Sequence, residues 1–221
     1  MIATISNLND SIPPDASRWT VGPGPYVEGD DPLRDTSMTP EQRKEFFNTW
    51  VAGYYTHKSL TSRNISDLEM LKADPSPPPT TKLISPSELA SLTDFAAVRR
   101  SEVPVRSVDS TILADQARRA LYDEERAKLW PRVTVDVIWC EKSAWVMIDA
   151  AWWLQTLQDE SREKNIRGRE VKFTMFPGAN HFVSGLSVLF INDGNLPPFN
   201  YQPHWDIPEK AIAFFAGVVG V

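Results

Sequence analysis

Hydrophobic residues recur at helical spacing through the first half of the chain, and proline-rich breaks separate the runs. The first run follows Thr39-Pro40-Glu41-Gln42, which combines an N-cap residue, a proline at the first helical position and a residue that can close a capping box. It predicts a helix from residue 39 to about residue 55. A weaker pattern predicts a helix over residues 65–72. Patterns similar to the first predict helices over residues 85–95 and 110–128.

The pattern changes after Pro131. Residues 133–139 and 171–176 are rich in β-branched and apolar side chains and predict two strands, with a helix over 145–158 between them. Asp206-Ile-Pro-Glu209 then opens a last helix. Strand, helix, strand and helix predict a right-handed βαβα unit with two parallel strands, and therefore an α/β fold. Function in such units sits at the carboxyl ends of the strands.

These patterns predict three regions. Residues 1–38 show no sustained period and are expected to be irregular, residues 39–130 are mostly helical, and residues 131–221 carry the βαβα unit. No internal repeat is present.

The amino-acid composition argues against several classes of function. The net charge is −6 and the pI about 5.1, which argues against nucleic acid or an anionic membrane as partner. The single cysteine, Cys140, excludes an internal disulfide, and no signal peptide or membrane anchor is visible. A cytoplasmic protein is the expectation. The three histidines, His57, His181 and His204, lack a recognised ligand spacing, so we expect no metal and no cofactor.

His181 carries the most specific signal. It follows the second predicted strand in Gly178-Ala-Asn-His181-Phe182, with Asp206-x-Pro-Glu209 further on. This arrangement resembles the carboxyl-terminal part of the α/β-hydrolase superfamily, and more loosely its fungal members. The resemblance covers about 90 residues. It implies that His181 is the general base, that the strand over 133–139 is the penultimate strand of the sheet, and that residues 39–130 form a cap over the pocket. An ordinary surface histidine is the alternative.

The acid of the triad is less clear from the sequence. The superfamily has Gly-x-x-Asp after the penultimate strand, whereas this chain has Cys140-Glu141-Lys142-Ser143, with serine in place of the aspartate. Glu141 is the candidate acid, and a plain solvated turn carboxylate is an equal alternative. Cys140, at the end of a buried strand, is interpreted as core.

A small apolar substrate is the expected partner, because such pockets are mostly hydrophobic. The aromatic residues Trp50, Tyr54, Trp139 and Trp145 are candidate pocket walls, although core packing is the favoured interpretation of any single one. His57 is interpreted as a partner of the dipole at the end of the first helix.

The nucleophile is missing from the sequence. No G-x-S-x-G elbow and no HGG-type oxyanion loop occurs, and both are needed for acyl transfer in this fold. Only two strands are convincing where the superfamily has about eight. We therefore expect a shortened hydrolase that is inactive, with a strand edge exposed at residues 133–138 through which copies could associate. A non-catalytic binding or vestigial fragment and an unrelated helical interaction protein are the competing hypotheses.

About twenty residues, 183–202, separate His181 from the closing helix, where the superfamily has only a few. Val-Ser at the start and Tyr-Gln at the end can be encoded by the usual ends of a short fungal intron. A retained intron is one hypothesis for this segment, and a true loop insertion is the other.

Overall fold

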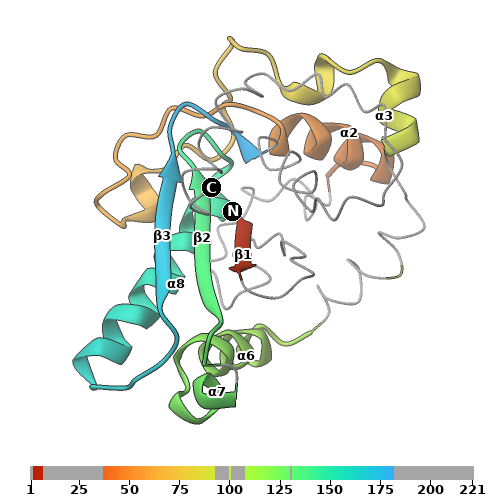
Figure 1. Ribbon diagram of the computed structural model, residues 1–221. Coiled ribbons are helices and arrows are strands. Elements are labelled where there is room, and N and C mark those ends of the chain that lie inside the picture. The colour runs from red at the N-terminus through yellow and green to blue at the C-terminus, as the bar shows by residue number, and fades with distance from the viewer. Residues whose placement is uncertain (1, 7–36, 93–99, 101–107, 130, 182–221) are drawn as a thin grey trace.

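Three strands form one sheet in a computed structural model, which describes residues 2–6, 37–92, 100, 108–129 and 131–181 (Figure 1). The central strand, β2 (Thr134–Cys140), is parallel to β3 (Val171–Phe176). The strand β1 (Ile2–Ser6) pairs with the other edge of β2 and is antiparallel to it. The described structure is thus an α/β arrangement, and the two parallel strands predicted from the sequence are confirmed.

The strand β1 corrects two expectations. Residues 1–38 were expected to be irregular, yet Ile2–Ser6 forms a ladder in which Ile2 pairs with Ile138 and Ser6 with Thr134. Five residues are too few to show a reliable alternation, and the partner is far away in the chain, so the local pattern did not reveal the strand. The expectation of an exposed edge on residues 133–138 is also wrong. One edge of β2 pairs with β1 and the other pairs with β3.

The helix α8 (Trp145–Glu163) connects the parallel strands and packs against β2. It begins where the sequence predicts and runs five residues beyond the predicted end. Its first seven residues, 145–151, are buried except for Asp149. Val135, Val137 and Trp139, on one face of β2, belong to the same buried cluster as α8. This strand–helix layer is the centre of the described core.

The helix α2 (Pro40–Val51) starts with the predicted capping box. The Thr39 hydroxyl accepts a hydrogen bond from the Gln42 backbone at 3.3 Å, and the Gln42 side chain accepts one from the Thr39 backbone at 2.8 Å. The helix ends four residues earlier than predicted. A side chain at Gly53 would lie 3.0 Å from the Ala73 Cβ, so glycine allows the chain to leave the helix against a neighbouring segment.

The irregular segment after α2 contains two short 3-10 turns. The helix predicted over 65–72 is only the turn Ile65–Asp67, and a second turn covers Thr80–Lys82. The next helix, α3 (Pro86–Leu92), begins as predicted.

The helix predicted over 110–128 is two helices, α6 (Ser110–Tyr122) and α7 (Glu124–Leu129). Asp123 separates them with an extended backbone, at ψ 122°. Its carboxylate accepts a hydrogen bond from the Arg126 backbone at 2.8 Å, and it therefore caps the second helix.

The helices occupy opposite ends of the sheet. In Figure 1, α2 and α3 lie at the end marked by the arrowheads of β2 and β3, whereas α6 and α7 lie at the other end. The helices of residues 39–130 are therefore divided between the two ends. None of the helices in the described parts of the chain is long and apolar enough to cross a membrane. Residues 183–202 and the last predicted helix lie outside the described residues.

Candidate functional site

The candidate site lies at the carboxyl ends of β2 and β3, where the loops that follow the two strands run side by side. The Glu141 backbone donates to the Phe176 carbonyl at 3.0 Å, and the Lys142 backbone donates to the Ala179 carbonyl at 2.8 Å. These bonds continue the parallel ladder beyond the strands. The loop with Glu141 and the loop with His181 are thereby brought together, as the sequence predicts.

Glu141 binds the histidine loop directly. Its Oε2 atom accepts a hydrogen bond from the Gly178 backbone at 2.6 Å. Gly178 has φ +69°, a left-handed conformation that favours glycine. The carboxylate thus fixes the turn three residues before His181.

Asn180 anchors the same loop from the other side. Its side chain is 2% exposed and donates to the Ala52 carbonyl at 2.8 Å and to the Thr80 hydroxyl at 2.9 Å. Both partners belong to the segment that follows α2. Sequence reasoning missed this residue, because only long-range partners give an asparagine such a role.

His181 follows immediately and is 8% exposed, with its Nδ1 atom buried. The residues just before it are fixed by the Glu141 contact at Gly178 and by the Asn180 anchor.

A third segment, Tyr55–His57, crosses the end of β2. The Tyr55 backbone donates to the Lys142 carbonyl at 3.1 Å. His57 Nε2 lies 3.0 Å from the Ser143 carbonyl, and His57 Nδ1 lies 3.0 Å from the Glu69 backbone nitrogen. Because the Glu69 N–H can only donate, Nδ1 accepts and Nε2 carries the proton.

The interpretation of His57 as a helix-dipole partner is wrong. The helix α2 ends at Val51, six residues earlier, and both ring nitrogens bind other segments. Burial lowers the pKa of His57 below its ordinary value, and this outweighs the opposite effects of the Ser143 carbonyl and of Glu69. The neutral ring is the form that fits both hydrogen bonds.

A polar cluster also holds the segment Tyr55–His57 at the end of β2. Lys142 Nζ lies 2.9 Å from Asp74 Oδ2 and 3.1 Å from the Thr56 hydroxyl, which itself donates to Asp74 at 2.9 Å. Partial burial raises the pKa of Asp74, but the hydrogen bonds from Lys142 and Thr56 outweigh it and the pKa is lowered. The ionised carboxylate thus ties residues 56 and 74 to the end of β2.

The thiol of Cys140 is core, as the sequence interpretation expected. The residue is 3% exposed, and burial raises the pKa of its thiol to about 12, so a reactive thiolate is disfavoured at neutral pH. Ser143, which stands where the superfamily has its aspartate, is fully buried beside this thiol.

The four predicted wall residues are all buried. Trp50, Trp139 and Trp145 belong to the main core cluster, and Tyr54 is 4% exposed. Trp50 also donates through its indole to the Met70 carbonyl at 2.7 Å. Their packing agrees with the core alternative that the sequence left open. That these four residues line a substrate pocket stays a prediction.

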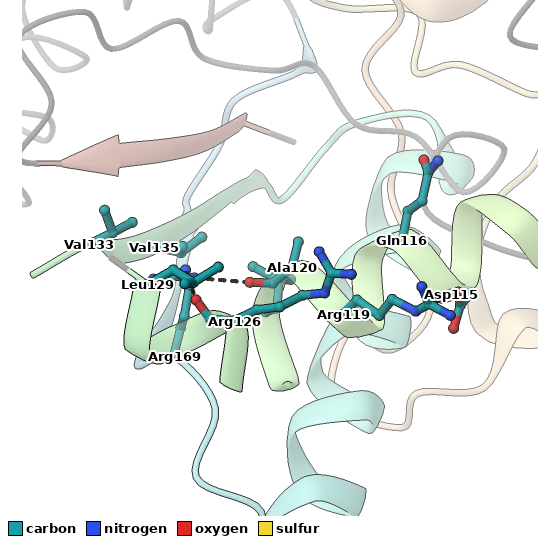
Figure 2. A pocket seen from close by; sticks show the side chains of 10 residues that line it. Asp115, Gln116, Arg119, Ala120, Arg126, Leu129, Val133, Val135 and Arg169 are labelled. Carbon is teal, nitrogen blue, oxygen red and sulfur yellow. Dashed lines mark hydrogen bonds and ion pairs between the residues drawn. The ribbon is translucent and has the colours of Figure 1, made fainter. Parts of the chain in front are cut away.

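Within the described residues, no three His, Cys, Asp or Glu side chains gather as metal ligands. A cavity of about 400 Å³ is present at the opposite end of the sheet, between α6, α7 and β2 (Figure 2). None of the predicted site residues lines it.

Comparison with known proteins gives no match: no family model, no curated protein and no solved structure is significantly similar to this chain. The function is therefore argued from the site alone.

Proposed function

We propose that the chain is related by descent to the α/β-hydrolases and that His181 descends from the general base of such an enzyme. The observation that carries the proposal is the pairing of two loops at the carboxyl ends of parallel strands. One loop holds a carboxylate and the other a histidine, and the carboxylate is hydrogen-bonded to the histidine loop at Gly178. The loops that would carry the acid and the base of such an enzyme are thus adjacent.

Glu141 is the proposed acid. Its Oε2 is already engaged by the Gly178 backbone at 2.6 Å, so its proposed role is to hold the loop of His181.

The chain by itself is proposed to be inactive in acyl transfer. A base needs a nucleophile within hydrogen-bond reach, and the sequence has no G-x-S-x-G motif. The buried Ser143 is no substitute, because its side chain is closed off from solvent. By descent the substrate class is a small apolar ester, amide or epoxide.

Turnover of p-nitrophenyl butyrate and labelling by a fluorophosphonate test this proposal. The wild-type chain and the His181→Ala variant are expected to show the same slow rate within about twofold, and neither is expected to be labelled. Robust turnover that is lost in His181→Ala would show that the chain is an active enzyme. Circular dichroism of both proteins checks that the variant is folded.

The alternative is a non-catalytic binding protein. The position of the described cavity favours it, since the cavity lies at the end of the sheet away from His181. A ligand that binds there with unchanged affinity in His181→Ala would support this second function.

A further inference from the structure

The cavity at the amino end of the sheet has apolar walls. It lies where α6 and α7 meet the start of β2 and the turn before β3 (Figure 2). Its volume of about 400 Å³ falls within the range of small-molecule pockets, roughly 300–1,000 Å³. The apolar residues of the wall are Ala120, Leu121, Leu129, Val133 and Val135.

The polar residues of the cavity are predominantly basic. Arg119, Arg126 and Arg169 line it together with a single carboxylate, Asp115. The chain as a whole carries a net charge of −6, so this region is a local concentration of positive charge on an acidic protein. Such a site attracts anions and disfavours cations.

The three arginines are engaged differently. Arg119 forms an ion pair with Asp115 at 2.8 Å. Arg169 donates through Nε to the Ala120 carbonyl and through Nη2 to the Arg126 carbonyl, both at 2.9 Å. Through these bonds Arg169 connects α6, α7 and the start of β3.

Arg126 is different, because the structure shows no ion pair to its guanidinium among the described residues. Its side chain is exposed and extends from α7 toward α6 (Figure 2). Leu129, one turn further along the same helix, is 68% exposed. A large exposed apolar side chain and a guanidinium thus both line the cavity.

We propose that this cavity binds a free amphipathic carboxylate of medium chain length. The apolar tail lies against Leu129, Val133 and Val135, and the carboxylate meets the guanidinium of Arg126. Guanidinium and carboxylate match in geometry and form charge-assisted hydrogen bonds. This site is separate from the proposed His181 site and does not depend on it.

Isothermal titration calorimetry with three ligands of equal tail length tests the charge requirement. Sodium decanoate, decanol and decyltrimethylammonium are titrated into the full chain below their critical micelle concentrations. Decanoate is expected to bind at one site per chain and about tenfold or more tightly than decanol, since a hydrogen bond to a charged group is worth that much. The cation is expected to bind most weakly.

Two variants and one matched control locate the site. Arg126→Gln is expected to weaken decanoate binding about tenfold and to leave decanol binding unchanged. Leu129→Asp is expected to abolish binding, and its exposure makes the substitution compatible with folding. Arg118→Gln removes the same charge from an exposed position of α6 that does not line the cavity. This control variant should bind decanoate as tightly as the wild type does.

Several outcomes would overturn the proposal. These are the absence of decanoate binding, equal affinity for decanoate and decanol, or equal losses in Arg126→Gln and Arg118→Gln. Binding only to vesicles of anionic phospholipid, with none to free decanoate, would replace the free carboxylate by a membrane surface and would also refute it.

Discussion

The two ends of the sheet are built differently. At the carboxyl end, three segments far apart in the chain are joined by hydrogen bonds, and Asn180 and His181 are buried. At the amino end, α7 has no buried residue, and α6 buries only Ala114 and Tyr122. The first end is held by buried polar partners, whereas the second is held mainly through Arg169 and Tyr122, buries few side chains of its helices and contains a cavity. The difference is compatible with the two proposals, a preorganised histidine at one end and an apolar ligand at the other.

The largest expected contrast is between two apolar residues. Trp145, at the start of α8, is 2% exposed, while Leu129 on α7 is 68% exposed. Trp145→Ala should lower the free energy of unfolding by about 3–5 kcal/mol, and Leu129→Ala should change it by less than about 0.5 kcal/mol. Urea unfolding followed by circular dichroism measures both. Equal losses would remove the distinction between the two ends.

Asn180 tests whether hydrogen bonds fix the carboxyl end. Asn180→Ala removes two buried hydrogen bonds and should cost about 2–3 kcal/mol. Asn64→Ala is the control, because the Asn64 side chain binds only the neighbouring Ser66 and is exposed; it should cost under about 1 kcal/mol. A loss no larger at Asn180 than at Asn64 would count against the anchor.

Two glycines, one taken from each end, sharpen the comparison. A Cβ atom at Gly168 would lie 2.7 Å from the Leu121 carbonyl oxygen and 2.7 Å from the Tyr122 Cα. Gly168→Ala should therefore cost about 2 kcal/mol through backbone displacement. At Gly178 the space is open but φ is +69°, and Gly178→Ala should cost about 1 kcal/mol. Denaturant unfolding distinguishes the two, and a neutral Gly168→Ala would mean that the amino end is loose throughout.

The smallest expected effect is a pH dependence at His57. Its pKa is lowered in the folded protein, chiefly by burial, so the unfolded chain binds a proton more readily. Stability is then complete above the unfolded pKa of about 6.5 and falls as the pH is lowered toward the folded pKa. The slope contributed by one such group is at most about 1.4 kcal/mol per pH unit.

Unfolding at pH 7.5 and at pH 5.5 measures this effect, with His57→Gln as the comparison. Glu69, Asp74 and Lys142 also face the ring, and the two carboxylates lose their contributions only at lower pH, because their pKa values are lowered as well. The variant should therefore show a weaker pH dependence over this interval. An identical dependence would exclude His57 as its source.

The sequence predicted the parallel β2–α8–β3 unit because its periodicity is local and strong. It also predicted that the loops of Glu141 and His181 would meet, since both follow parallel strands. The sequence did not predict the antiparallel strand β1, the Asn180 anchor or the two hydrogen bonds of the His57 ring. Each depends on partners at least 12 residues away, and for β1 and Asn180 at least 100 residues away, a distance at which a local pattern carries no information.

The pairing of β1 with β2 also has a consequence during protein synthesis. Ser6 pairs with Thr134, a separation of 134 − 6 = 128 residues. At about 5–20 residues per second, a ribosome needs roughly 6–26 s to make the partner strand after it has made β1. Throughout this time the backbone groups of Ile2–Ser6 lack their native partner. The residues that complete one edge of the sheet are thus synthesised well before the strand they pair with and must wait for it.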